Sequence, residues 1–202
     1  MARNVYVIDK RLHTNQQDLM HEIRESRNTP GSFPNEIITV NQNLTMEQIC
    51  LRVIARSGGE IGVLRIVSHG NASSIQLGTG MQTPNHVWNF RILRGHWVGR
   101  YPRIELHVCG VASATRLSCT VLDFPDTETA LAQLATACTP GTINSNSAGH
   151  ALCQALADSA GIPVVASYDV QLGPQPSGLE GRIRYFIPAQ YFRRDGVNPL
   201  AA

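Results

Sequence analysis

The chain has 202 residues, of which 43% are hydrophobic and 16% are charged, and its formal net charge is +2. These values are typical of one globular domain with a buried core, and they exclude a disordered chain. The basic residues are scattered and do not cluster with aromatic residues, so we expect no nucleic acid among the partners.

No apolar run reaches the about 18 to 20 residues that a membrane helix needs, and the N-terminal residues lack the pattern of a signal peptide. The chain has five cysteines, an odd number, without regular spacing. Such a set does not suit a disulfide framework and favours a reducing compartment. We therefore expect a cytoplasmic protein that does not contact a membrane.

Short apolar runs alternate with segments of helical periodicity along the chain. The sequence predicts strands at 4–9, 36–40, 62–68, 103–109, 162–167 and 181–189, and a small hairpin arm at 73–78. It predicts helices at 14–26, 45–59, 84–98, 127–139 and 148–161, with a break in the third near Gly95. Thr45 can cap the second helix, in which Ile49, Val53 and Arg56 follow one another in register, and glycines end the second and last helices.

This alternation of strands and helices predicts a single α/β domain over residues 1–202. We expect three layers, with about six mostly parallel strands flanked by helices. Residues 114–146 form the least regular part and are expected to be an insertion, and residues 193–202 are expected to be a frayed tail.

Two of the predicted strands end in the same way. The strand in "GVLRIVSHG" is followed by His69 and Gly70, and forty residues later the strand in "RIELHVCG" ends with Cys109 and Gly110. The carboxyl ends of parallel strands line one crevice, and neighbouring strands are about 4.8 Å apart, so His69 and Cys109 are expected to lie close together. The glycines let the chain turn away from the sheet and leave backbone N–H groups facing the crevice.

A thiol beside an imidazole is the minimum for nucleophilic acyl transfer. His69 would take the thiol proton, the Cys109 thiolate would attack a carbonyl, and His69 would then protonate the leaving amine. The N–H groups of Gly70 and Cys109 would hold the oxyanion. Because acidic residues are scarce near both motifs, we expect a dyad without an orienting carboxylate. The reaction needs no organic cofactor, and we expect none.

The remaining histidines and cysteines offer weaker candidates. His107 shares the side of the strand with Cys109 and could line the specificity pocket or compete as the base, although a core or helix-facing position is favoured. His150 and Cys153 have a spacing that suits zinc, but no second pair exists, so we predict no metal site. The other thiols, which are expected to be buried or partly buried, are Cys50, Cys119 and Cys138.

The order of a strand with "SHG", forty residues, and a strand with "CG" resembles the caspase-like fold of the clan CD cysteine peptidases. The stretches "VLRIVSHGNASSIQLG", "IELHVCGVAS" and "AGHALCQALADSAGIPVVAS" are most similar to small bacterial caspase-like domains. The resemblance implies a caspase-hemoglobinase-like sandwich and a thiol protease with Cys109 as nucleophile and His69 as base and acid. The Q-A-C-x-G signature of caspases proper is absent, because His107 and Val108 precede the cysteine.

The resemblance also implies that loops at the same sheet edge build the substrate pocket. Asp169, just past the fifth strand, would favour arginine or lysine before the cut; Asp123 and Asp126 compete for this role, and Asp126 can instead cap a helix. By the same resemblance the region 114–146 could be an activation loop, a partner-docking surface or a plain surface insertion, of which the last is favoured.

These observations predict a cysteine endopeptidase that hydrolyses peptide bonds in protein or peptide substrates. An activating partner, or a homodimer through an exposed edge of the sixth strand, is a further expectation. The main alternative is a catalytically inactive caspase-like binding or scaffold domain. A nucleotide-binding domain of the flavodoxin type is a third hypothesis, but "DKRLHTN" after the first strand contains no glycine-rich phosphate loop.

Overall fold

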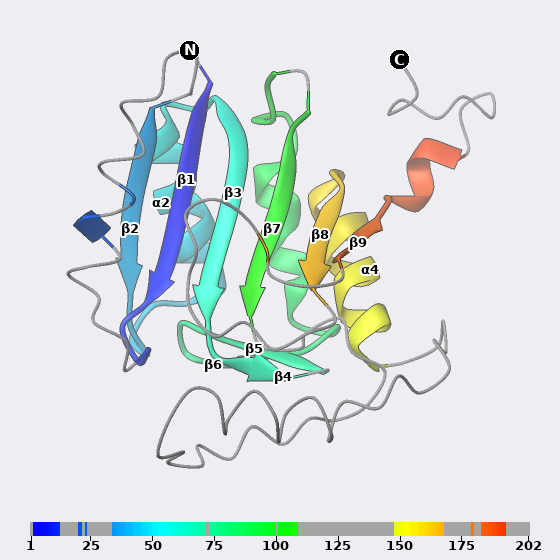
Figure 1. The fold of residues 1–202 in the computed structure, drawn as a ribbon, viewed down its shortest axis with the longest axis horizontal. Coiled ribbons are helices and arrows are strands. Elements are labelled where there is room, and N and C mark those ends of the chain that lie inside the picture. The colour runs from blue at the N-terminus through cyan, green and yellow to red at the C-terminus, as the bar shows by residue number, and fades with distance from the viewer. Residues whose placement is uncertain are drawn as a thin grey trace.

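The computed structural model describes residues 2–12, 20–21, 23, 34–71, 73–99, 101–108, 148–167, 179 and 183–192. A six-stranded sheet with the order β2-β1-β3-β7-β8-β9 forms its centre (Figure 1). The strands are β1 (Arg3–Asp9), β2 (Asn35–Val40), β3 (Ile61–Ser68), β7 (Arg103–Val108), β8 (Val164–Ser167) and β9 (Ile183–Phe186). All neighbours are parallel except β8 and β9, which are antiparallel. The prediction of an α/β fold with a mostly parallel sheet is therefore confirmed.

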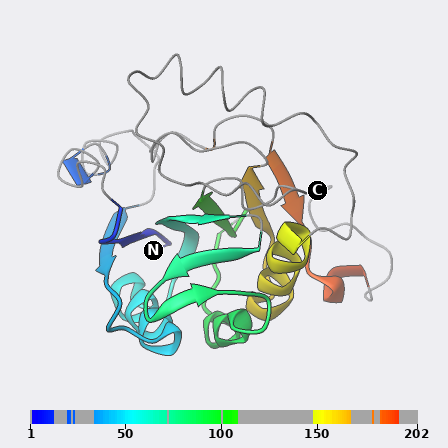
Figure 2. The same cartoon turned by 90° about the horizontal axis from the view of Figure 1, so that it is seen from below.

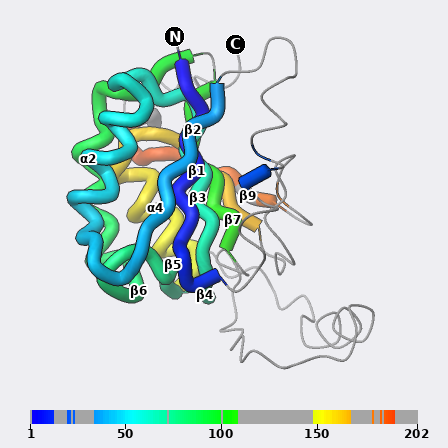
Figure 3. Tube along the Cα trace, turned by 90° about the vertical axis from the view of Figure 1, so that its left-hand side faces the viewer, coloured from blue at the N-terminus to red at the C-terminus, as the bar shows by residue number. Residues whose placement is uncertain are grey.

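One face of the sheet is covered by α2 (Met46–Ser57), the 3₁₀ helix η2 (Val87–Leu93) and α4 (Ala148–Ala160), as Figure 3 shows from the side of β2. The main hydrophobic core lies between these helices and the sheet. The central strands β3 and β7 are buried along most of their length. Burial on both faces accounts for the nearly continuous apolar run of β3, whereas β7 carries Arg103, Glu105 and His107 at alternate positions.

Helix α2 begins and ends where the sequence predicts. The Thr45 side chain accepts a hydrogen bond from the backbone N–H of Gln48 and forms a capping box, and Gly58 ends the helix in the left-handed conformation with φ of 63°. The buried face contains Met46, Ile49, Cys50, Val53 and Ser57. The prediction that Arg56 follows this register is wrong, because Arg56 is exposed to solvent beside the buried Ser57.

The helix predicted at 84–98 is shorter and tighter in the structure. Only Val87–Leu93 are helical, and they form a 3₁₀ helix whose buried residues are Val87, Phe90 and Leu93. These side chains recur at every third position, which matches the three residues per turn of a 3₁₀ helix. Gly95 follows with φ of 83°, and Trp97 beyond it forms an isolated bridge with Ile61 at the start of β3.

The other face of the sheet bears a smaller cluster of buried side chains. Tyr6, Ile8 and Val67 of the strands pack there with Ile23, which is fully buried. Ile23 belongs to the helix predicted at 14–26, of which the structure describes only residues 20, 21 and 23. The predicted helix at 127–139, the insertion at 114–146 and the tail at 193–202 lie outside the described residues.

A three-stranded antiparallel sheet lies below the carboxyl ends of β3 and β7 (Figures 1 and 2). Its strands are β4 (Gly70–Asn71), β5 (Ser74–Leu77) and β6 (Gly80–Gln82), so the predicted hairpin arm is confirmed. Arg11 anchors it by donating a hydrogen bond of 2.9 Å to the carbonyl of Gly78, and Thr79 donates one of 2.9 Å to the carbonyl of Leu44. Among the described residues, no helix has the length and apolar character that a membrane crossing requires.

Candidate functional site at the ends of β3 and β7

The ends of β3 and β7 lie level with each other in the sheet. The two strands are parallel neighbours, and their last residues, Ser68 and Val108, are Cα partners. His69 follows Ser68, is partly exposed, and accepts a hydrogen bond of 2.8 Å at its carbonyl from the Gln76 N–H. Cys109 follows Val108 in the sequence and, with Gly110, lies outside the described residues.

Gly70 packs against the end of β7. A Cβ atom at this position would collide with the Val108 side chain and would lie 2.7 Å from the Ser74 carbonyl oxygen. Glycine is thus required because the backbone of residue 70 lies so close to Val108 and Ser74. The sequence suggested instead that Gly70 eases a sharp turn. Gly70 is not among the described glycines with positive φ. The loop after His69 is therefore held directly against the residue that precedes Cys109.

The backbone N–H of Gly70 points away from the small sheet. Gly70 and Ile75 are antiparallel partners, and the hydrogen bond between His69 and Gln76 next to them shows that this is a non-hydrogen-bonded pair. The Gly70 N–H is therefore not used by β5. The N–H therefore points to the side of β4 that faces away from β5.

His107 is buried one step inside the sheet from this edge. It is 4% exposed and is the Cα partner of Val67, and its Nε2 atom lies 3.5 Å from Oε2 of Glu105. That distance is too long for a good hydrogen bond, and neither ring nitrogen has a hydrogen-bond partner. His107 thus lies in the interior of the protein, with its ring beside the Glu105 carboxylate.

Glu105 is the centre of a buried charge network that the sequence analysis missed. Its carboxylate accepts hydrogen bonds of 2.6 Å from Nε of Arg65 and 2.7 Å from Nε of Arg103. Burial alone would raise the pKa of Glu105, but the contacts with His107, Arg65 and Arg103 outweigh burial and lower the pKa to about 2. Glu105 is therefore ionised at neutral pH.

The network extends across the sheet in one row. Arg65 also donates a hydrogen bond of 3.0 Å to the Tyr6 hydroxyl, and Tyr6, Arg65 and Glu105 are successive Cα partners on β1, β3 and β7. Charged residues at alternate positions of "RIELHV", and one arginine inside the apolar "VLRIV", were the signal for this row. Glu105 is an acidic side chain close to the second motif, but it lies beside His107. The expectation of a dyad without an orienting carboxylate stays a prediction.

A second ion pair lies at the carboxyl end of β1. Asp9 is fully buried and accepts hydrogen bonds of 2.8 and 2.6 Å from the Arg11 guanidinium, which also contacts the carbonyl of Gly78. The hydrogen bond to Asp9 raises the pKa of Arg11 above its ordinary value, against the opposing effect of burial. This pair fastens the small sheet to the edge of the large one.

The other predicted site residues are distributed as follows. Asp169, Asp123 and Asp126 lie outside the described residues, as do Cys119 and Cys138. Cys50 and Cys153 are buried, and burial raises the pKa of both thiols, that of Cys50 to about 12. Their thiols are therefore poor nucleophiles.

His150 is 4% exposed and lies edge-on to the Phe186 ring at 5.5 Å. Within the described ranges, no group of three or more histidine, cysteine or acidic side chains could hold a metal ion. His150 thus packs in the interior between α4 and β9.

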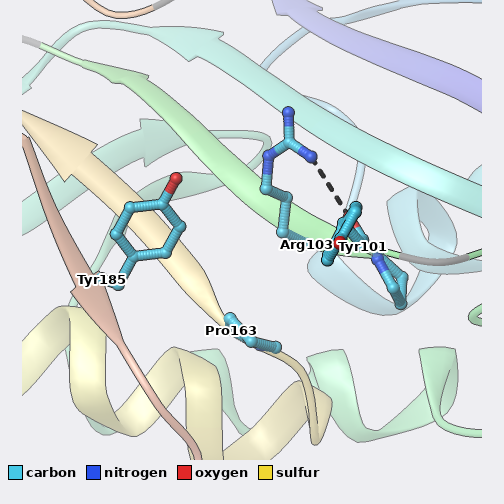
Figure 4. Close-up of a pocket in the computed structure, with 5 residues that line it drawn as sticks. Tyr101, Arg103, Pro163 and Tyr185 are labelled. Carbon is cyan, nitrogen blue, oxygen red and sulfur yellow. Dashed lines mark hydrogen bonds between the residues drawn. The ribbon is translucent and has the colours of Figure 1, made fainter. Parts of the chain in front are cut away.

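One cavity lies at the end of the sheet opposite His69. It has a volume of about 450 Å³ and is lined by Tyr101, Pro102, Arg103, Pro163 and Tyr185 (Figure 4). These residues come from the amino ends of β7 and β8 and from β9. Its position at the amino ends separates it from the crevice where functional groups of parallel sheets gather.

Comparison of the chain with protein-family models gives no match. Comparison with curated proteins likewise gives no match.

Proposed function

We propose that the protein is a caspase-like cysteine endopeptidase in which Cys109 is the nucleophile and His69 is the general base and acid. The observation that carries this proposal is the pairing of Ser68 with Val108, the residues directly before His69 and Cys109. The packing of Gly70 on Val108 supports it, because it holds the loop after His69 against the end of β7.

The alternation of side chains along the strands gives further support. Val67 and His107 are Cα partners, and both lie on the face of the sheet opposite the main core. Successive side chains of a strand alternate between faces, so residues two positions further lie on the same face while the chain stays extended. If the chain stays extended for one more residue, His69 and Cys109 would share this face, and strands about 4.8 Å apart would let an imidazole and a thiol meet.

The proposed reaction proceeds in two halves. His69 takes the proton of the Cys109 thiol, and the thiolate adds to the substrate carbonyl carbon to form a tetrahedral oxyanion. The N–H groups of Gly70 and Cys109 would donate hydrogen bonds to this oxyanion. Its collapse breaks the C–N bond as His69 gives its proton to the leaving amine, and water activated by His69 then hydrolyses the thioester.

The substrate class of this proposal is a protein or peptide, with Asp169 as the candidate for selecting a basic residue before the cut. The proposal keeps the cytoplasmic location and the absence of a cofactor expected from the sequence. The competing proposal is a scaffold domain that retains the fold without turnover. The two functions differ in the reactivity that they require of the Cys109 thiol, because a structural thiol is inert.

The test compares wild-type protein with Cys109→Ala and His69→Ala, each incubated with a diverse peptide library and read by mass spectrometry. His86→Ala is the matched control, because His86 is exposed and its ring contacts only Thr83 among the contacts that the structure gives it. Cuts made by the wild type and the control but absent from the other two variants would support the dyad.

A second measurement separates an idle peptidase from a scaffold. The rate at which Cys109 reacts with iodoacetamide is compared with the rate for the same cysteine in denatured protein. A rate well above the denatured value that falls in His69→Ala would show an activated thiol awaiting a partner. No cleavage together with an ordinary or slower rate would overturn the peptidase in favour of the scaffold.

A further inference from the structure

The outer side of β2 is an unpaired strand edge in the described structure, since β2 is the first strand in the sheet order (Figure 3). The carbonyls of Pro34 and Val40 accept hydrogen bonds of 2.9 and 2.8 Å from β1 and the residue after it. Backbone groups alternate in direction along a strand, so the even-numbered residues of β2 face β1. The N–H and C=O groups of Ile37 and Thr39 therefore point outward.

A groove runs between this edge and helix α2. It has a volume of about 380 Å³ and is lined by Ile37, Ile38, Thr39, Arg52, Ala55 and Arg56. Its two polar walls are the outward backbone of β2 and the exposed side chains of Arg52 and Arg56.

Arg52 and Arg56 give the described lining of the groove a positive charge. In the part of the chain that the structure describes, no acidic side chain forms an ion pair with Arg52 or Arg56. Glu36, the acidic residue of β2, is already paired with Arg3 at 2.6 Å. An anionic occupant would therefore find two unpaired guanidinium groups.

We infer that this groove binds an acidic, extended segment of a partner protein, which adds a strand to β2 and places carboxylates on Arg52 and Arg56. The spacing of the two elements supports this occupant. Side chains two residues apart on a strand are about 6.6 to 6.8 Å apart on one face. Four residues of helix span about 6 Å, which is the separation along α2 of Arg52 and Arg56. Acidic residues at alternate positions therefore match the two arginines.

The strand edge selects a peptide over other polyanions. The outward groups of Ile37 and Thr39 include both donors and acceptors, and an extended peptide backbone complements such a row in the manner of β-augmentation. A phosphate backbone offers acceptors but no donors, and it would leave the outward carbonyls without partners. The inference does not depend on Cys109 or on the proposed peptidase activity.

The test measures binding of three labelled eight-residue peptides to the full chain by fluorescence anisotropy, at low and at physiological salt. The first peptide alternates Glu and Val, the second contains the same residues as a Glu block followed by a Val block, and the third is the alternating peptide with N-methylated amides along one edge. Mass spectrometry after the measurement verifies that the peptides are intact.

We expect the alternating peptide to bind about tenfold more tightly than the block peptide, and the N-methylated peptide to lose binding, because both the spacing and the backbone ladder are used. Arg52→Gln and Arg56→Gln should each weaken binding about fivefold, with less effect at higher salt. Arg91→Gln is the matched control, because Arg91 is exposed on η2 and stacks on Trp88 at 4.5 Å.

The inference is overturned by equal binding of the alternating and block peptides, which would show charge attraction without strand addition. It is equally overturned if Arg91→Gln weakens binding as much as the α2 variants, or if the alternating peptide does not bind at millimolar concentration. Tighter binding of a single-stranded oligonucleotide than of the alternating peptide would assign the groove to phosphate instead. Circular dichroism of each variant verifies that the fold is retained.

Discussion

Gly70 lies against the side chain of Val108 so closely that no Cβ atom fits between them. The contact joins the loop after β3 to the last described residue of β7. It adds a packing contact to the pairing of β3 with β7, so a single added methyl group tests the site.

Gly70→Ala should destabilise the protein and remove peptidase activity. The added methyl meets both Val108 and the Ser74 carbonyl, and overpacking of this kind costs about 1 to 3 kcal/mol. Gly80→Ala is the control, because nothing lies within 4 Å of its Cβ position. Urea unfolding and peptide cleavage measure the two effects. Equal stability and activity of the two variants would contradict the close packing.

The Glu105 network should make stability depend on acid. The folded pKa of Glu105 is about 2 against an ordinary 4.5, so its contribution is complete above about pH 5 and is lost as the pH falls toward 2. A difference of this size corresponds to about 3 kcal/mol at neutral pH. Glu105→Gln should therefore be destabilised by about that amount at pH 7 and show a much flatter dependence between pH 2 and 5.

Urea unfolding at a series of pH values measures this dependence. Glu36→Gln provides the comparison, because the Arg3–Glu36 pair is at the surface, with side chains 41% and 20% exposed. Surface pairs contribute about 0 to 1 kcal/mol, so that variant should retain most of the stability and the acid dependence of the wild type. Parallel curves for wild type and Glu105→Gln would refute a structural role for the ionised carboxylate.

The two histidines near the site should differ in their effect on catalysis. His69→Gln should lower kcat/KM by about 100-fold or more, the size of a lost general base. His107→Gln should lower it by no more than about tenfold, since His107 is buried against Glu105 in the sheet and acts on the site only through packing. The measurement uses the best peptide from the library. A larger loss in His107→Gln than in His69→Gln would transfer the role of base to His107.

The thiols should fall into separate reactivity classes. With a pKa of about 12, Cys50 is thiolate in only about one molecule in ten thousand at pH 8, and Cys153 is fully buried. Iodoacetamide at pH 8 should leave both unlabelled in folded protein and label both in urea. Peptide mapping by mass spectrometry gives the result for each cysteine. Labelling of Cys153 in the folded state would show that α4 opens far more readily than its packing predicts.

Strands and helix ends could be predicted because their signals are local. Apolar runs mark the buried parallel strands, and Thr45 and Gly58 mark the ends of α2 through their own hydrogen bonds and backbone angles. The 3₁₀ geometry of η2 could not be predicted with the same ease, because apolar residues at every third position also suit an α-helix. The position of Arg56 was predicted wrongly because only its spacing from Ile49 and Val53 was considered. An arginine at such a spacing can bury its apolar stem, but here the side chain is exposed.

In the candidate site, too, local features could be predicted from the sequence, and contacts between distant segments could not. The positions of His69 and Gly70 after a strand follow from local pattern, whereas the packing of Gly70 on Val108 depends on which strands become neighbours. The ion pair between Arg65 and Glu105 is equally non-local, since forty residues separate them. Strand order is a property of the whole chain, and no short stretch encodes it.

The Arg65–Glu105 pair has a consequence for how the sheet assembles. If β3 slipped by one residue against β7, its charged side chain would turn to the opposite face and enter the apolar core. A slip of two residues would keep Arg65 on the same face of the sheet but set it beside Arg103 or His107. The Arg65 guanidinium would then lie next to a second guanidinium or an imidazole instead of a carboxylate. Only the observed alignment sets Arg65 beside Glu105, and the same alignment brings Ser68 level with Val108. The buried ion pair between Arg65 and Glu105 thereby favours the strand register in which the carboxyl ends of β3 and β7 lie level.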